Sequence, residues 1–236
     1  MNIISIDPSL ISTAVAIGNK KNGLKLINYC REEDATLSKG GLSKWFKLCE
    51  QHLELKYIKY RKFNTYSEGE IIKLKDYDLI TTQIINDIEK YIDRSEPIKI
   101  GIEGYSFNSN NGDIVDLVAF STLLRKKLFD QISQDIIVVS PSTLKQESCK
   151  LTYKPIDIGK KKPKLEYRNN AGIAGGKFTK TEIYLSIIEN TDLNDYWSIL
   201  CTSLRDDILA GKTIKKPFED VNDSYVLYHI LKNNSI

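Results

Sequence analysis

The hydrophobic pattern of the chain changes period along its length, from short strands at the start to helices further on. Apolar runs of strand length, separated by turn residues, occur at 2–7, 12–18 and 24–30. Because the connections between them are short, these three segments are expected to form an antiparallel meander. Two later apolar runs, 98–103 and 135–140, predict two more strands, and the second is expected to be buried on both faces.

Helical spacing of apolar residues appears between and after these strands. Segments with apolar residues three or four positions apart, and therefore predicted to be helical, are 42–56, 71–92, 113–129, 142–149, 178–190, 196–209 and 218–231. The stretch 150–176 has no such period, is rich in Lys, Gly, Asn and Pro, and is expected to be a mobile loop. This order of elements predicts one α/β domain over 1–236, in which helices flank a mixed five-stranded sheet.

The last predicted helix, 218–231, carries two acids on its apolar side. Leu227 and Ile230 lie near the middle of its apolar arc, and Asp220 and Asp223 fall in the same arc, three residues apart. Carboxylates that face a core cost several kcal/mol each if unpaired, and a divalent cation commonly compensates two acids placed together. The alternative is that Asp220 caps the helix and Asp223 interacts with the helix dipole.

Two predicted central strands also end in an acid. Asp7 closes the first strand on the face that carries Ser5, and Glu103 closes the fourth on the face that carries Gly101. The small neighbours are expected to leave room for an ion or a phosphate beside each acid. Alternatively, an Asp before Pro-Ser is an ordinary turn residue, and a Glu before Gly simply closes a strand.

Composition narrows the chemistry of any metal site and suggests a partner. The net charge is +3, yet the segment 145–180 holds ten basic and three acidic residues, which leaves −4 for the remainder. Such a segment suggests a polyanionic partner, although a solvated lysine-rich loop has the same composition. With two His and four scattered Cys, a metal would be held by oxygens, as Mg²⁺ or Mn²⁺ is.

No apolar run is long enough to span a membrane and no signal-peptide pattern opens the chain, so a cytoplasmic location is expected.

The four acids and the strings around them resemble the RuvC-type Holliday junction resolvases of the ribonuclease H-like superfamily. The matching segments occur in the family's order: 3–18 (I-I-S-I-D-P-S to A-I-G), 102–107 (I-E-G-Y-S-F), 137–145 (I-V-V-S-P-S-T-L-K), 175–180 (G-G-K-F-T-K) and 220–225 (D-V-N-D-S-Y). The residue after Asp7-Pro8 is Ser9 where the family has Gly. The long interval before Glu103 implies a helical insertion around 42–93, and the basic loop around 150–176 is also extended.

This resemblance implies a ribonuclease H-like fold and a two-metal nuclease site. Asp7, Glu103, Asp220 and Asp223 would hold two Mg²⁺ ions about 4 Å apart, with Mn²⁺ as a substitute. One ion would generate hydroxide from water and the other would stabilise the leaving oxygen. The implied activity is symmetric paired nicking of a four-way junction or other branched DNA. A homodimer matches the two-fold symmetry of a junction, with 113–129 as the expected interface. A bacterial, phage or viral context would fit an enlarged member.

Basic and aromatic residues near these motifs are candidates for DNA binding. Those expected to neutralise phosphates are Lys145, Lys160, Lys161, Lys162, Lys164, Lys177 and Lys180. Tyr105 and Phe107, just after Glu103, are candidates for stacking on an unpaired base. Solvation of the lysines, and ordinary packing of the two aromatic rings, are the competing interpretations.

Three other classes of protein remain as alternatives. An actin-like ATPase or sugar kinase also begins with a strand that ends in Asp, but the chain lacks the second phosphate loop of that class. The stretch 171–178 is no P-loop, because Ala171 replaces its first Gly and Phe178 its Ser or Thr. No nucleotide cofactor is therefore expected. A non-catalytic nucleic-acid-binding member of the fold would have no reason to keep four buried acids. A nuclease acting on RNA–DNA hybrids, flaps or packaged DNA would share the same metal chemistry.

Overall fold

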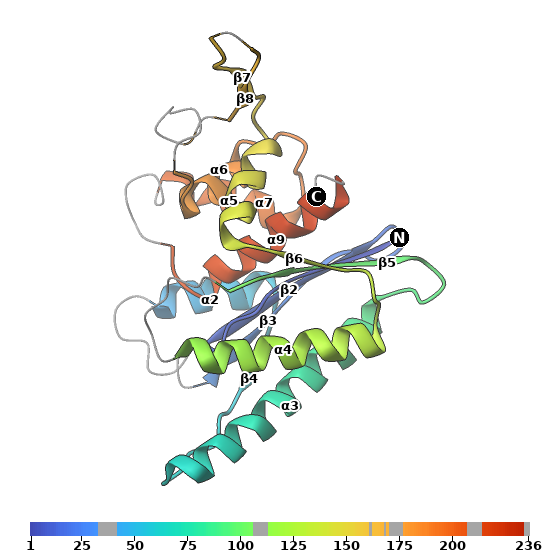
Figure 1. Cartoon of the computed structure of the whole chain (residues 1–236), viewed down its shortest axis with the longest axis vertical. Helices are drawn as coiled ribbons and strands as arrows, with labels where there is room; N and C mark the ends of the chain where they lie inside the picture. The colour runs from blue at the N-terminus through green and yellow to red at the C-terminus, as the bar shows by residue number, and fades with distance from the viewer. Residues whose placement is uncertain are drawn as a thin grey trace.

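The computed structural model describes residues 1–32, 42–105, 113–160, 162–167, 169, 177–206 and 214–233. Its main sheet has six strands: β1 (Asn2–Asp7), β2 (Ser12–Asn19), β3 (Gly23–Arg31), β4 (Glu54–Ile58), β5 (Ile98–Glu103) and β6 (Ile136–Val139). Their order across the sheet is β4-β3-β2-β1-β5-β6. The first three strands are antiparallel, whereas β4 is parallel to β3, β5 to β1 and β6 to β5. The predicted mixed sheet, a meander followed by parallel strands, is confirmed (Figure 1).

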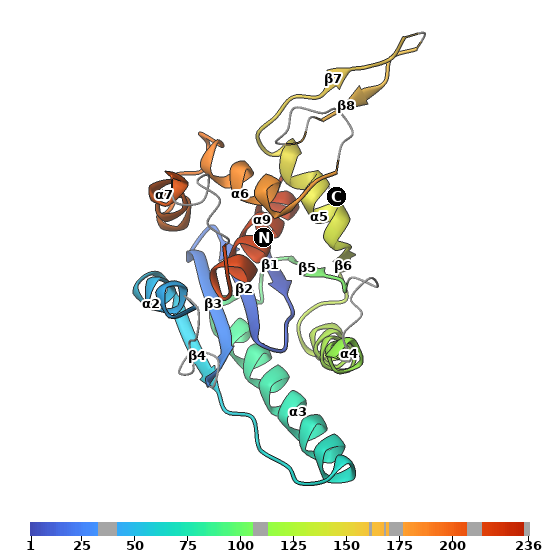
Figure 2. The same cartoon turned by 90° about the vertical axis from the view of Figure 1, so that its left-hand side faces the viewer.

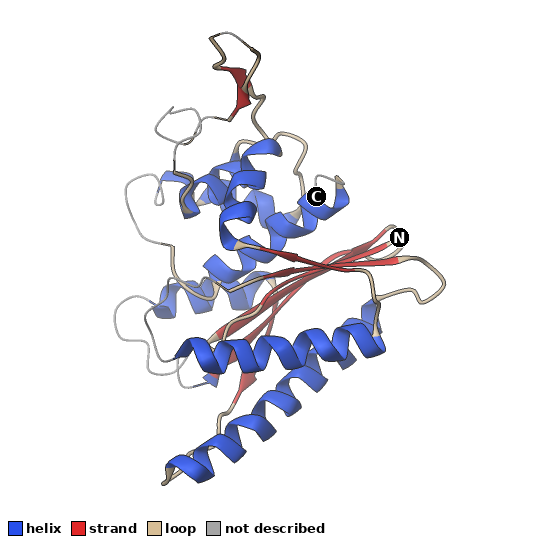
Figure 3. Cartoon of the chain, viewed as in Figure 1, coloured by secondary structure: helices blue, strands red, loops and turns tan. Residues whose placement is uncertain are grey.

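Helices cover both faces of this sheet. They are α2 (Leu42–His52), α3 (Tyr66–Tyr91), α4 (Asp113–Gln131), α5 (Pro141–Lys150), α6 (Lys180–Ile188), α7 (Tyr196–Ser203) and α9 (Phe218–Lys232). One hydrophobic core includes residues of α2, α5, α6, α7 and α9, and a second includes residues of α3 and α4. Figures 2 and 3 show the two sets of helices on opposite sides of the strands. The fold is therefore a three-layer α/β arrangement with α9 lying directly on the sheet.

Helix α9 is buried all round. Its residues from Asp220 to Leu231 are all buried, including Asn222, which accepts a hydrogen bond of 2.9 Å from the indole Nε1 of Trp197. The side of α9 that carries Asn222 is covered by α7, which supplies Trp197 and Cys201 there. The N-cap residue is Pro217, without a side-chain capping bond, so Asp220 is not a helix cap.

Small residues in the strands make room for α9. The hydroxyl of Ser5 donates a hydrogen bond of 2.6 Å to the backbone oxygen of Ser224. A Cβ on Gly101 would lie 2.6 Å from a methyl carbon of Leu231. The expectation that Ser5 and Gly101 leave space for an ion or a phosphate is therefore wrong, because the helix itself fills that space.

Two sequence-based expectations about the sheet edges are also wrong. The predicted helix 42–56 ends at His52, and residues 54–58 form β4, which adds a sixth strand beside β3. Strand β6 is the opposite edge, and Val138 within it is 49% exposed rather than buried on both faces. Local apolar spacing could not distinguish these cases, because an edge position depends on which strands pair.

Part of the segment expected to be an irregular loop is a hairpin. Strands β7 (Ile156–Asp157) and β8 (Leu165–Glu166) are antiparallel, and Asp157 accepts hydrogen bonds from the backbone N–H groups of Gly159 and Lys164. The hairpin projects beyond α5 and α6, away from α3 and α4 (Figures 1 and 2). Residues 161, 168 and 170–176 of the same segment lie outside the described ranges.

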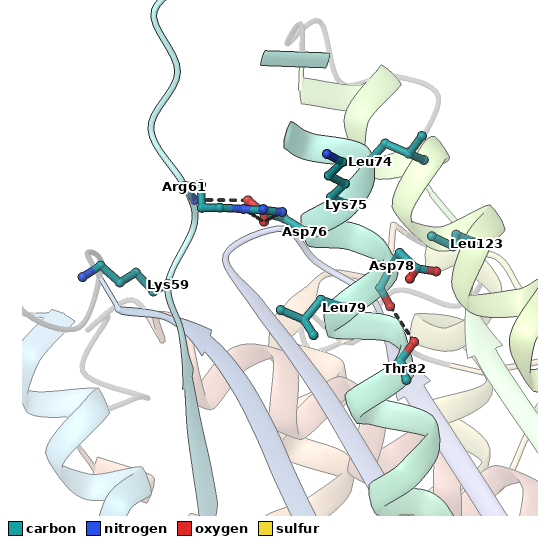
Figure 4. A pocket seen from close by; sticks show the side chains of 9 residues that line it. All are labelled: Lys59, Arg61, Leu74, Lys75, Asp76, Asp78, Leu79, Thr82 and Leu123. Atoms are coloured by element: carbon teal, nitrogen blue, oxygen red, sulfur yellow. Dashed lines mark hydrogen bonds and ion pairs between the residues drawn. The ribbon is translucent and has the colours of Figure 1, made fainter. Parts of the chain in front are cut away.

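A cavity of about 860 Å³ lies beside α3, on the connection from β4. Arg61 in that connection binds Asp76 of α3 through its backbone N–H and its guanidinium, with distances of 2.6–3.1 Å (Figure 4). The cavity is on the face that α3 and α4 cover, and none of the four candidate acids lines it.

Across the described ranges, no helix is long and apolar enough to span a membrane.

Candidate metal centre

Three of the four predicted acids converge at the carboxyl ends of two neighbouring parallel strands. The register pairs Ile6 of β1 with Ile102 of β5, so the next residues along, Asp7 and Glu103, leave the sheet side by side. Both point to the α9 face, because each lies two residues after a strand residue that contacts that helix, Ser5 for Asp7 and Gly101 for Glu103. One carboxylate oxygen each of Asp7, Glu103 and Asp223 lies within 4.8 Å of the others.

The fourth acid, Asp220, lies beside this cluster but outside the group of three. It is one turn before Asp223 on α9, is only 4% exposed, and contributes to the electrostatic repulsion on Asp7. Asp7, Glu103 and Asp223 are 8%, 7% and 1% exposed. All four acids that the sequence selected therefore lie in one buried region, formed by segments up to 216 residues apart.

Burial and mutual repulsion raise the pKa values of all four acids. For Asp7 the largest cause is burial, followed by repulsion from Glu103 and Asp220, and its pKa is well above the ordinary value. Burial is likewise the main cause of the raised pKa of Glu103 and of Asp220. The pKa of Asp223 is raised to about 8, because burial and the neighbouring carboxylates outweigh the attraction of Lys180. Ionising the whole cluster in the free protein is consequently unfavourable.

Two lysines partly offset this charge. Lys180, the first residue of α6, forms ion pairs with Asp223 and, at 3.3 Å, with Glu219. Lys216, just before α9, lies 3.2 Å from Asp220. Lys145 also lowers the pKa of Glu103 through its charge, after the larger effects of burial and of Lys180. Four carboxylates and two paired ammonium groups leave a formal charge of about −2 when all are ionised.

The donor set fits a divalent cation that prefers oxygen. Among the described residues, Glu103 Oε2 and Asp220 Oδ2 are buried side-chain oxygens without a hydrogen-bond donor. An unsatisfied buried carboxylate oxygen is costly, and a bound cation would satisfy it. Because the donors are carboxylates without His or Cys, Mg²⁺ or Mn²⁺ suits them better than Zn²⁺.

The predicted DNA-binding residues fall into different surroundings. Lys180 belongs to the acid cluster, which the sequence did not indicate. Lys160, Lys162 and Lys164 are exposed on the β7–β8 hairpin, where Lys164 forms an ion pair of 2.5 Å with Glu166. Lys145 is on α5, and Lys177 is exposed just before α6. Lys161 lies outside the described residues.

Tyr105 is held against α4. Its hydroxyl accepts a hydrogen bond of 2.8 Å from the guanidinium of Arg125, which also lies 5.1 Å from the centre of the ring. This contact favours the packing interpretation of Tyr105. Phe107 lies outside the described residues.

The sequence reasoning missed Lys216 as a residue of this region. A signal was present, because Lys216 is four residues before Asp220, the spacing at which side chains meet on a helix.

The strand order and the buried carboxylate cluster define the class of molecule: a three-layer α/β protein with a mixed six-stranded sheet and an acidic site at the carboxyl ends of β1 and β5. Neither a protein-family model nor a curated protein sequence matches the chain. Among solved structures it is similar to Thermus thermophilus RuvC in complex with a Holliday junction substrate, with a TM-score of 0.47 and 8% identity. That alignment covers 99% of this chain and 96% of the other. A second T. thermophilus RuvC structure gives 0.46 and 11% identity, over 100% and 97% of the two chains.

Proposed function

We propose that this protein is a divalent-cation-dependent endodeoxyribonuclease that cuts branched DNA, with four-way junctions as its preferred substrate. The observation that carries the proposal is the convergence of Asp7, Glu103 and Asp223, with Asp220 beside them. Buried carboxylates from two strand ends and one helix form a cluster of oxygens that has no evident structural purpose. A structural protein would gain stability by replacing it with apolar residues.

The four acids would hold Mg²⁺ or Mn²⁺, two ions in the fully loaded site. Bound there, such cations supply Lewis-acid stabilisation of a phosphodiester and lower the pKa of water for its hydrolysis. The chain itself contributes rigid placement: β1, β5 and α9 supply residues to the two cores, so their acids lose little freedom when a ligand binds. Lys180 adds a positive charge next to the acids, at the point where a phosphate would approach.

Basic residues around the cluster would position the DNA. Lys145 and Lys177 lie on or beside the helices of the α9 face, and the β7–β8 hairpin carries Lys160, Lys162 and Lys164. Contacts of this kind bind phosphates without reading sequence, and their strength falls with increasing salt. Preference for branched DNA would therefore come from the shape of the surface that these residues make.

Paired cuts on a symmetric junction require two sites, so the proposal includes a homodimer. We place its interface on α4, where Val115 is 71% exposed and Phe129 is 48% exposed. Light scattering on the purified protein measures the mass directly. A monomer at micromolar concentration that still makes paired cuts would contradict this part of the proposal.

The test offers the full chain four labelled substrates: a four-way junction, a fork, a linear duplex and an RNA–DNA hybrid, each with Mg²⁺ or with EDTA. Symmetric nicks on the junction in Mg²⁺, absent with EDTA, are expected. Preferential cleavage of the hybrid would instead assign the site to a different nuclease activity. Binding of the junction without cleavage of any substrate would indicate a non-catalytic member of the fold.

A further inference from the structure

Lys216 contacts both the turn after β1, close to Asp7, and Asp220 on α9. Its ammonium group lies 3.2 Å from Asp220 Oδ1 and donates a hydrogen bond of 2.6 Å to the hydroxyl of Ser9. Ser9 is two residues after Asp7, whereas Asp220 belongs to α9. One side chain therefore links the turn that follows β1 to the helix that supplies the other acids.

The turn at Ser9 is itself well fixed. The backbone N–H of Ser9 donates to Thr13 Oγ1 at 3.2 Å, and Thr13 Oγ1 donates to the backbone oxygen of Ser9 at 2.7 Å. Lys216 thus binds to a rigid anchor, and its side chain is 32% exposed. A surface lysine with a single partner usually keeps its ammonium group hydrated. That the side chain of Lys216 is about two-thirds covered therefore indicates that the acids attract it strongly.

Lys216 satisfies only one oxygen of Asp220. The other, Asp220 Oδ2, is buried and has no hydrogen-bond donor. A cation that binds this carboxylate together with Asp7 would come close to the ammonium group, and two positive charges at short range in a buried site repel strongly.

We propose that Lys216 is a tethered counter-ion of the metal centre, which stabilises the metal-free cluster and weakens its affinity for divalent cations. This inference rests on the proposed function only as far as a divalent cation binds at the acids. A cation held by Asp220 would displace the ammonium of Lys216 from that carboxylate, and the hydrogen bond to Ser9 would keep the lysine close by. Lys180, which pairs with Asp223 from α6, is held independently and remains in place in the variants below.

The test measures Mn²⁺ binding to the full chain without DNA, by isothermal titration calorimetry and by electron paramagnetic resonance. The variants are Lys216→Met, which keeps the length of the side chain without its charge, and Lys216→Arg, which keeps the charge. Lys20→Met is the matched control, because Lys20 is exposed in the turn after β2, at the opposite end of that strand from Ser12.

We expect Lys216→Met to tighten Mn²⁺ binding by at least about tenfold, because one positive charge leaves the neighbourhood of a divalent ion. Its melting temperature in EDTA should fall, and its gain in melting temperature on adding Mn²⁺ should exceed that of the wild type. Lys216→Arg and Lys20→Met should bind Mn²⁺ within about threefold of the wild type. If Lys216→Met and Lys216→Arg lost similar amounts of stability in EDTA, packing of the side chain would explain the loss, and the role of its charge would be overturned.

The possible failures can be told apart. Unchanged or weaker Mn²⁺ binding by folded Lys216→Met would overturn the counter-ion role while leaving the nuclease proposal intact. Tighter binding by Lys216→Met, in a protein that cleaves none of the four DNA substrates, would support the counter-ion role and reject the nuclease. Absence of Mn²⁺ binding by the wild type would overturn the role of Lys216 together with the metal centre.

Discussion

Replacing Asp223 by Asn should remove activity and yet stabilise the metal-free protein. Asp223 is 1% exposed, and its pKa is raised to about 8 by burial and by repulsion from Glu103. An acid with a raised pKa binds its proton more tightly in the folded state, so it lowers stability as the pH rises above its unfolded pKa of about 3.8. At pH 7 this penalty amounts to about 4 kcal/mol, and it saturates near pH 8.

The attraction of Lys180 is already included in the raised pKa of Asp223, so losing that partner is not a separate cost. The net gain is still smaller than the full penalty, because the buried NH2 group of Asn needs two hydrogen-bond acceptors where a protonated carboxyl needs one. We therefore expect a net stabilisation of roughly 1–3 kcal/mol at pH 7, or about 3–9 °C in melting temperature for a chain of this size. The gain should shrink toward pH 4, close to the unfolded pKa of about 3.8, and disappear at lower pH, where the wild-type carboxyl is protonated in both states.

The assay is thermal unfolding in EDTA at pH 4, 5.5, 7 and 8, for the wild type, Asp223→Asn and the exposed control Asp192→Asn. The control should follow the wild type within about 0.5 kcal/mol. With Mg²⁺, the wild type should gain stability and Asp223→Asn should gain much less. A fall in the melting temperature of Asp223→Asn in EDTA at pH 8 would refute the reasoning, because the cluster would then be a satisfied ion-pair network.

Three further outcomes are expected. Glu103→Gln should reduce junction cleavage by at least about a hundredfold while leaving junction binding, measured by gel shift in Ca²⁺, within a few-fold of the wild type; undiminished turnover would reject Glu103 as a site residue. Gly101→Val should destabilise the protein by roughly 1–3 kcal/mol in urea unfolding, because its side chain would collide with Leu231; an unchanged midpoint would contradict the close approach of α9. His229 is buried and its pKa is lowered to about 4, so the unfolded state binds its proton first and stability should fall by a few kcal/mol as the pH drops from 6.5 to 4. His229→Gln should remove that part of the acid sensitivity, and identical pH slopes in the two proteins would show that His229 does not titrate in this way.

The sequence was sufficient for the elements whose pattern is local. The meander formed by β1, β2 and β3 follows from short connections and strand-length apolar runs, and the acids at the ends of β1 and β5 follow from alternation. The sequence also selected Asp220 and Asp223 as a pair three residues apart. Each of these features depends on residues that are close together in the chain, so the spacing of residue types is enough to predict it.

Other features depended on which segments lie side by side. Residues 54–58 have a helix-compatible pattern but pair with β3 as an edge strand, and Val138 is exposed because nothing described pairs beyond β6. Likewise, Gly101 looks like space for a ligand in the sequence, whereas the fold places Leu231 there. Pairing and layer contacts form between distant segments, so no local period records them.

The acid cluster shows both contributions at once. Residue types and spacing already marked Asp7, Glu103 and the two aspartates of α9 as unusual, since a buried carboxylate needs a partner wherever it lies. Only the parallel pairing of β1 with β5, together with the burial of α9 against them, brings the oxygens within a few ångströms. The same packing brings Lys180 and Lys216 to these acids, a role that depends on three-dimensional proximity. The sequence thus determined which groups carry charge, and the tertiary structure determined which charges meet, because electrostatic energy depends on distance through space and on exclusion of water.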